Sequence, residues 1–269
     1  IIRTNLCTRA NTGNSFIRRC ILKKLIRTGV FLSALCVCNT TAFTQPNRIS
    51  YNDQQLFLSG ANLAWIDFAR DIGPGPTKFG EFSDILLDMH DHGGNALRWW
   101  LHTNGQVTPE FDASDFVIGP GQGALDDLEK IFDLAWEREI GLKLCLWSFD
   151  MLRGTNSNLV KNRNRLMLTD STYLQAYIDN ALIPIVERFK DHPAVLAWEI
   201  FNEPEGMSNE FGWNFVEHVP MADIQRFINR TTGAIHRTAP NALVTSGAWS
   251  FITPVSYTHL RAHETHIDL

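Results

Sequence analysis

One local pattern recurs along the body of this 269-residue chain. A short apolar segment rich in β-branched and aromatic residues leads into a loop, and a segment with helical periodicity follows. We expect strands at residues 56–63, 95–99, 142–146, 195–201 and 242–247. Apolar spacing of three and four predicts helices at residues 82–89, 125–135, 174–185 and 224–235. This alternation implies a parallel sheet with helical crossovers.

Two architectures have this alternation, an open doubly wound sheet and a (β/α)8 barrel. The doubly wound sheet usually has a glycine-rich phosphate-binding turn after its first strand. Here the first expected strand leads into Trp65, and the Gly73-Pro74-Gly75 stretch has no such fingerprint. Polar and aromatic residues follow the expected strands, where a barrel has its active site. We therefore predict an α/β fold, a (β/α)8 TIM barrel, truncated in this chain after about its fifth strand.

Several single residues indicate local structure. Gly93 and Gly141 stand where helices are expected to stop. Asp170 or Ser171 is expected to cap the third helix. Cys145 is the one cysteine between residues 45 and 269, so no intramolecular disulfide is expected there. Its apolar neighbours indicate a small core residue.

The two ends of the chain differ from its body. Residues 1–44 contain seven Lys or Arg and no Asp or Glu, and small residues follow an apolar run at 30–37. We expect residues 1–20 to be upstream or unstructured sequence and residues 21–44 to be a secretory signal peptide. This predicts a secreted, periplasmic or cell-surface protein without stable membrane insertion, because a membrane span needs about 20 apolar residues.

Residues 256–265 resemble translated sequencing-adaptor sequence, and residues 256–269 are expected to be a non-native tail. Their histidines lack the spacing of the helical zinc motif, so no metal ion is expected, nor any organic cofactor. Residues 45–255, the expected domain, contain 16 Lys or Arg against 27 Asp or Glu, a net charge of −11. An acidic domain of this kind is not expected to bind nucleic acid. We expect it to be a monomer.

The segment with the most chemical information ends the fourth expected strand. Glu203 follows Asn202 there, and Pro204 cannot continue a strand ladder. Cleavage of a glycosidic bond needs a carboxylic acid that protonates the leaving oxygen and, in a retaining enzyme, a second carboxylate that attacks the anomeric carbon. An amide such as Asn202 can bond the sugar 2-hydroxyl in the transition state. The alternative interpretation is a strand-to-loop turn with a solvated Glu203.

Residues 48–249 resemble glycoside hydrolase clan A, and within it family 5 with its β-mannanase-like members. Four strand ends carry the resemblance, at residues 60–65, 95–100, 146–150 and 198–204. It implies that Glu203 is the acid/base, that Asn202 contacts the sugar 2-hydroxyl and that Arg98 orients the nucleophile. The family's nucleophile is a Glu at the end of strand seven. No residue here matches it, so we expect the chain as given to be inactive, poorly soluble and incomplete.

The position of Arg98 in the sequence also indicates a place near the catalytic carboxylates. An Arg at the end of an apolar strand needs solvent or an acidic partner, and near a nucleophilic carboxylate it would lower the pKa of that group. A peripheral salt bridge is the alternative. Glu199 lies four residues before Glu203, on the same face by strand alternation and about 13 Å deeper. We expect it to be structural and paired inside the barrel, with Arg98 as a candidate partner.

Tryptophan offers a large, rigid and amphipathic face to a sugar ring. The candidates at or after strand ends are Trp65, Trp99 or Trp100, Trp147 and Trp249. Packing in the core is the alternative for each. Trp136 lies in an expected helix and Trp198 in an expected strand, and both are predicted to pack. The polar candidates for bonding sugar hydroxyls on the loops of the same face are His102, Asp67, Asp150 and Glu205, of which His102 is predicted to bind substrate. An ordinary solvated loop residue is the alternative for each of them.

Together these features predict a secreted retaining endo-β-glycanase that hydrolyses a β-1,4-linked polysaccharide by double displacement. β-Mannan is the first candidate substrate. A β-1,4-glucanase with the same fold is one alternative, since mannose and glucose differ at C2 and no residue decides between them. A non-catalytic carbohydrate-binding fragment is the other.

Overall fold

The computed structural model describes residues 50–52 and 54–250. These residues all belong to the second of two compact units of the chain, Arg48–Leu269. The predictions for residues 1–20, 21–44 and 256–269 lie outside the described residues. Within the described ranges, no helix has both the length and the apolar character that crossing a membrane requires.

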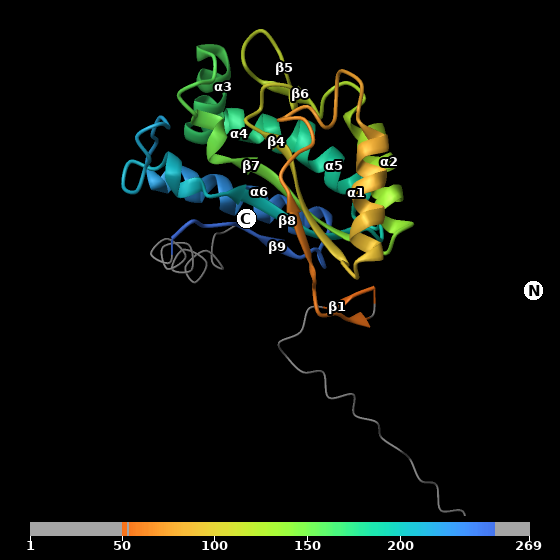
Figure 1. Ribbon diagram of the computed structural model, residues 1–269. Coiled ribbons are helices and arrows are strands. Elements are labelled where there is room, and N and C mark those ends of the chain that lie inside the picture. The colour runs from red at the N-terminus through yellow and green to blue at the C-terminus, as the bar shows by residue number, and fades with distance from the viewer. Residues whose placement is uncertain (1–49, 53, 251–269) are drawn as a thin grey trace, which may run out of the picture. The chain divides into compact units, whose positions relative to one another are not determined.

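Five parallel strands form the main sheet in the order β3-β4-β7-β8-β9 (Figure 1). Their bounds are Gly60–Leu63, Ala96–Thr103, Gly141–Ser148, Val195–Asn202 and Val244–Thr245. Each lies in or overlaps one of the five expected segments. Consecutive strands of the chain are neighbours throughout, as in the wall of a barrel, whereas a doubly wound sheet reverses its order. The predicted parallel barrel-type sheet is confirmed for these strands.

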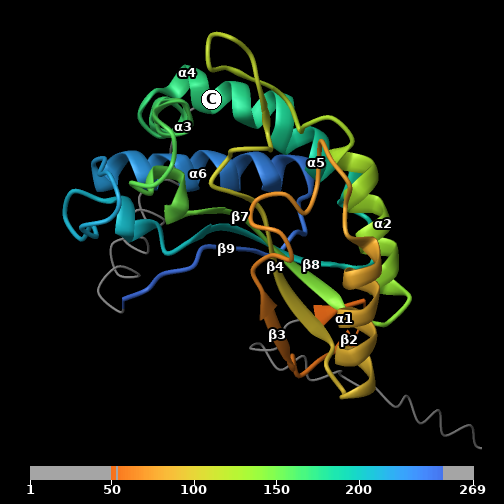
Figure 2. The same cartoon turned by 45° about the horizontal axis from the view of Figure 1, so that its top comes forward.

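The helices cover one side of this sheet and form an arc around it (Figure 2). The crossovers contain α1 (Phe79–Asp91), α2 (Ala124–Trp136), α5 (Ile183–Phe189) and α6 (Met221–Thr238). The third crossover also contains α4 (Ser171–Tyr177), which a π-helical turn, η3 (Ile178–Leu182), joins to α5. All four predicted helices are confirmed. Their apolar stripes are buried against the strands, which places the core between the sheet and the arc of helices.

Several short elements were not predicted. Two antiparallel hairpins pair β1 (Ser50–Tyr51) with β2 (Gln54–Gln55) and β5 (Glu110–Phe111) with β6 (Val117–Gly119). The helix α3 (Asn158–Thr169) was not predicted, because its mostly polar sequence lacks a clear apolar stripe. Single 3-10 turns follow two strands of the main sheet, η2 (Phe149–Leu152) after β7 and η4 (Pro204–Met207) after β8.

The expected helix ends are correct in part. Asp170 caps α4, since its Oδ1 accepts a hydrogen bond from the backbone N–H of Thr172 at 2.7 Å. Gly93 follows the end of α1 with a φ of 80°. The prediction for Gly141 is wrong, because α2 ends at Trp136 and Gly141 begins β7. A Cβ atom there would lie 3.3 Å from the ring of Tyr51, so glycine permits close packing.

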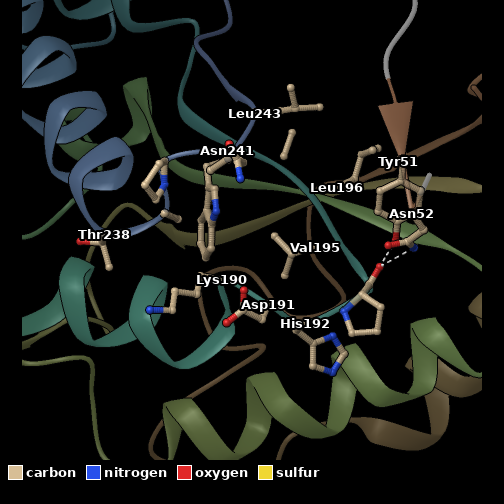
Figure 3. A pocket seen from close by; sticks show the side chains of 16 residues that line it. Tyr51, Asn52, Lys190, Asp191, His192, Val195, Leu196, Thr238, Asn241 and Leu243 are labelled. Carbon is tan, nitrogen blue, oxygen red and sulfur yellow. Dashed lines mark hydrogen bonds between the residues drawn. The ribbon is translucent and has the colours of Figure 1, made fainter. Parts of the chain in front are cut away.

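A cavity of about 450 Å³ opens at the amino end of β8 (Figure 3). Side chains of His192, Leu196 and Asn241 line it, together with Tyr51 and Asn52 from the first hairpin. Both of these last residues donate hydrogen bonds to the carbonyl oxygen of Pro193. The cavity lies at the opposite end of β8 from Glu203, so it is separate from the candidate site described next.

Candidate active site

Arg98 projects from β4 away from the helices. Strand side chains alternate between faces, and the neighbouring Trp99 packs edge-on against Phe82 of α1, with ring centroids 5.1 Å apart. Arg98 therefore lies on the face of the sheet that the helices leave uncovered. Its guanidinium stacks over the ring of Trp100 at 5.0 Å.

Glu199 is the principal partner of Arg98. Nε and Nη2 of the guanidinium donate to Oε2 and Oε1 of the carboxylate at 2.7 and 2.8 Å. Lys143 of β7 adds an ion pair to Oε2 at 3.0 Å, and the Glu199 side chain is 1% exposed. The prediction that Glu199 pairs with Arg98 inside the sheet is confirmed. A carboxylate held by two cations has a structural role in this arrangement.

Arg98 also sets the orientation of two asparagine side chains. Nη1 donates to Oδ1 of Asn62 on β3, and Nη2 donates to Oδ1 of Asn202 on β8, both at 2.9 Å. The amide nitrogen of Asn202 is thereby left to donate. The Asn202 side chain also forms a hydrogen bond with Glu203 that lowers the pKa of its carboxyl group. One guanidinium on β4 thus links side chains of β3 and β8.

Glu203 occupies a sharp turn at the end of β8. Its φ and ψ are 50° and 51°, the left-handed region that costs a non-glycine residue of the order of 1–2 kcal/mol. This conformation turns the chain directly from β8 into η4, and the side chain stays partly exposed. Strain of this kind persists where the surroundings fix the backbone, as functional sites commonly do.

The surroundings of Glu203 favour its protonated form. Burial is the largest cause of its raised pKa, and the negative charges of Glu205 and Asp150 act in the same direction. Arg98 and the bond from Asn202 oppose them. A carboxyl group with a raised pKa and partial exposure has the properties of a general acid.

Two nearby carboxylates already have partners. Oδ2 of Asp150 accepts a hydrogen bond from Ser148 at 2.9 Å, and Oδ1 pairs with Arg153 at 2.5 Å. Burial nevertheless raises the pKa of Asp150. Oε1 of Glu205 accepts backbone N–H bonds from Trp249 and Ser250. Both side chains are buried, so neither is the solvated loop residue that the sequence indicated.

Three predicted sugar contacts are wrong. Trp99 is fully buried, and its Nε1 donates to Oδ2 of Asp71 at 2.9 Å. Trp147 is fully buried between the rings of His102 and Tyr177, at 4.8 and 5.4 Å. His102 is buried as well, and burial lowers its pKa to about 3, so the ring is neutral and inaccessible to a substrate.

Trp65 and Trp249 remain accessible and stay predictions as sugar platforms. Trp65 is partly exposed and packs edge-on against Trp100, with ring centroids 5.4 Å apart. Trp249 is 67% exposed. Trp198 is buried as predicted, whereas Trp136 is 44% exposed, so the prediction that it packs in the core is wrong. Cys145 is a buried core residue, as expected.

Asp71 is a site residue that the sequence did not single out. Its carboxylate accepts backbone N–H bonds from Ile66 and Asp67 at 3.0 and 2.7 Å, besides the bond from Trp99. It thereby holds the loop that carries Trp65. Asp67 itself is an exposed loop residue.

No group of three or more metal-ligating side chains in residues 50–52 and 54–250 has the geometry to hold a metal ion. The carboxyl end of the sheet thus presents organic acids, amides, a guanidinium and aromatic rings. Groups of these kinds are able to bind and protonate polyhydroxylated molecules.

Comparison with known proteins identifies the group that shares this arrangement. The family model described as cellulase, glycosyl hydrolase family 5, matches residues 83–260. Mannan endo-1,4-beta-mannosidase of Mytilus edulis is 34% identical over 246 residues, which cover 82% of this chain and 66% of that protein. The same-named protein of Cryptopygus antarcticus is 34% identical over 234 residues, covering 79% and 59%.

Solved structures agree with the sequence matches. The β-mannanase of Mytilus edulis has a TM-score of 0.66 and 34% identity, over 75% of this chain and 61% of that one. The beta-1,4-mannanase of Aplysia kurodai has a TM-score of 0.68 and 35% identity, over 74% and 61%. The chain therefore spans less than two thirds of the length of these similar proteins.

Proposed function

The chain belongs to glycosyl hydrolase family 5, and from this premise we propose that it carries the acid/base of a retaining endo-β-1,4-mannanase. The observation that carries the proposal is Glu203, a partly exposed carboxyl group of raised pKa at the end of β8. Its neighbour Asn202 is oriented by Arg98. The mannanase names of relatives at 34% identity support mannan as the substrate class.

In the proposed mechanism Glu203 acts twice. Its protonated form first gives the proton to the glycosidic oxygen of the leaving sugar, while a second carboxylate attacks the anomeric carbon. The ionised Glu203 then takes a proton from water, which hydrolyses the glycosyl–enzyme intermediate. Burial and the charge of Glu205 raise the pKa of Glu203, which favours the protonated form that the first step needs. Asn202 is proposed to bond the sugar 2-hydroxyl.

The nucleophile is proposed to lie outside the described residues. The family resemblance implies a Glu at the end of a seventh strand, and the main sheet of the described part has five strands. Arg98, whose side chain is 20% exposed beside Asn202, is proposed to face it and keep it ionised. Export through a signal peptide at residues 21–44 and action as a monomer belong to the same proposal, supported by sequence pattern and composition alone.

The test uses the protein expressed from its complete source gene. Reducing ends released from linear β-1,4-mannan and from carboxymethylcellulose are measured under identical conditions, together with the fall in viscosity that endo-cleavage causes. Preference for mannan supports the proposal. Preference for cellulose would favour the β-1,4-glucanase alternative. The description of the matching family model, cellulase, supports that alternative. Binding to mannan without any cleavage would leave only a carbohydrate-binding role.

A further inference from the structure

Glu205 lies two residues after Glu203 and is 1% exposed. Its Oε1 accepts a hydrogen bond from the backbone N–H of Trp249 and another, at 3.0 Å, from that of Ser250. These donors are 44 and 45 residues further along the chain, in the segment after β9. Bonds from N–H groups to a charged acceptor are roughly twice as strong as neutral ones. Glu205 therefore ties the segment after β9 to the turn that carries Glu203.

The next residue, Gly206, holds a second aromatic side chain in place. The backbone N–H of Trp213 donates to the Gly206 carbonyl oxygen at 3.0 Å. A Cβ atom on Gly206 would lie 2.9 Å from the Trp213 ring, so the ring rests directly on the backbone of η4. The rings of Trp213 and Trp249 meet edge-on, with centroids 6.0 Å apart at 83°. The same short helix thus holds two tryptophans from distant segments side by side.

These aromatic side chains remain open to solvent. Trp249 is 67% exposed and Phe215, whose ring lies 5.4 Å from that of Trp213, is 55% exposed. Exposed apolar groups gathered beside a polar site are typical of ligand-binding surfaces. Arg153 supports this aromatic surface. Its guanidinium lies 5.7 Å from the centroid of the Phe215 ring and pairs with the buried Asp150.

We propose that Glu205 is a positioning residue, which fastens Trp249 beside Trp213 and Phe215 to form a surface that binds a sugar of the β-1,4-linked substrate next to Glu203. The proposal rests on the proposed function of Glu203.

The charge of Glu205 gives the proposal a second readout. The charged and polar groups that act on Glu203 are Glu205 and Asp150, which raise its pKa, and Arg98 and Asn202, which lower it. Glu205→Gln keeps an oxygen that accepts the N–H bonds of Trp249 and Ser250 but removes the charge. The alkaline limb of the pH–rate profile, where Glu203 loses its proton, should move to lower pH. A role in folding alone would not move it.

The experiment measures kcat and KM on mannohexaose with the enzyme from the complete gene. Trp249→Ala should raise KM about tenfold, the factor that about 1.4 kcal/mol of lost binding produces. Glu205→Ala should raise KM similarly, and the double variant should raise it no further, because both changes remove the same contact. Glu205→Gln should leave KM within about twofold of the wild-type value. It should also shift the alkaline limb of the pH–rate profile to lower pH. Glu210→Gln, the same charge change on an exposed residue of the same loop, should alter neither.

Independent, additive effects of Glu205→Ala and Trp249→Ala would overturn the proposal, as would an unchanged pH profile in Glu205→Gln. If Glu205→Ala does not fold, the pH–rate profile of Glu205→Gln and the KM of Trp249→Ala test the proposal in its place. A wild-type enzyme that cleaves no β-1,4-glycan would refute the proposed function instead. Calorimetric titration with mannohexaose would then test the surface separately, and equal affinity of wild type and Trp249→Ala would reject it.

Discussion

Arg98 and Glu199 face each other in a two-point ion pair, with Nε and Nη2 of the guanidinium 2.7 and 2.8 Å from the two carboxylate oxygens. This geometry fixes the plane of the guanidinium. Because the plane is fixed, Nη1 also reaches Asn62 on the neighbouring strand β3, and Nη2 reaches Asn202 on β8, one strand beyond β7. The pair contributes geometry to the site more than net stability, since desolvation offsets much of its attraction.

Arg98→Ala should destabilise the protein by up to about 3–5 kcal/mol, because it leaves the buried Glu199 carboxylate with Lys143 as its remaining cation. Urea unfolding followed by far-UV circular dichroism measures the change. Arg188→Ala is the matched control, since Arg188 pairs with Glu129 at the surface and such pairs contribute about 0–1 kcal/mol. Equal midpoints for the two variants would contradict the assignment of Arg98 as the link between strands.

Glu203→Gln should lower kcat on mannan by about 10²–10⁴-fold, the usual contribution of a general acid. An aryl β-mannoside with a good leaving group needs little protonation. Formation of the glycosyl–enzyme from it should therefore lose much less rate, seen as a burst of released phenol. A similar loss on both substrates would indicate that Glu203 does not act as the acid.

Trp99→Phe should act on stability and leave KM unchanged. The substitution removes one of the hydrogen bonds that the buried Asp71 carboxylate accepts, and a hydrogen bond to a charged group contributes about 1.5–3 kcal/mol. Trp136→Phe should change stability by less than about 0.5 kcal/mol, since Trp136 is largely exposed. Thermal unfolding and mannan kinetics of both variants make the test. A rise in KM for Trp99→Phe would contradict the conclusion that Trp99 does not contact the sugar.

His102 should make the protein less stable in acid. Its pKa is about 3 in the folded state against 6.5 for a free histidine, so the folded ring stays neutral while the unfolded chain takes up a proton. The stabilisation is present above pH 6.5 and is lost as the pH falls from there towards 3. The slope reaches about 1.4 kcal/mol per pH unit. Denaturant midpoints between pH 7.5 and 4 should fall less steeply for His102→Gln than for wild type.

The repeating pattern was sufficient to predict the parallel sheet and the helices between its strands. It also placed Glu199 on the inner face of its strand by alternation, which made Arg98 the candidate partner that the structure confirms. The same rule, applied to Trp99, would have excluded it from the site, since residues adjacent to Arg98 must point to the helices. The burial of Trp147 was not predictable from its strand, because rings from α4 and from the end of β4 cover it.

Other features depend on contacts between distant segments. The left-handed conformation of Glu203 has no local signal, since Glu rarely adopts it. Glu205 gave the appearance of an ordinary loop residue because its hydrogen-bond donors lie 44 and 45 residues away. Asp71 likewise derives its role from Trp99, 28 residues further along. Pattern-based prediction places side chains on faces, but the closing of loops over a site decides which of them are reachable.

The uneven burial of the eight tryptophans makes the protein its own optical probe. Trp99, Trp147 and Trp198 are shielded from water, whereas Trp249 is two-thirds exposed and Trp65 partly so. The shielded rings should emit at shorter wavelengths and resist collisional quenching by acrylamide. The exposed rings should dominate the quenchable, longer-wavelength fraction. A sugar chain resting on Trp65 or Trp249 would therefore reduce quenching without changing the emission of the core.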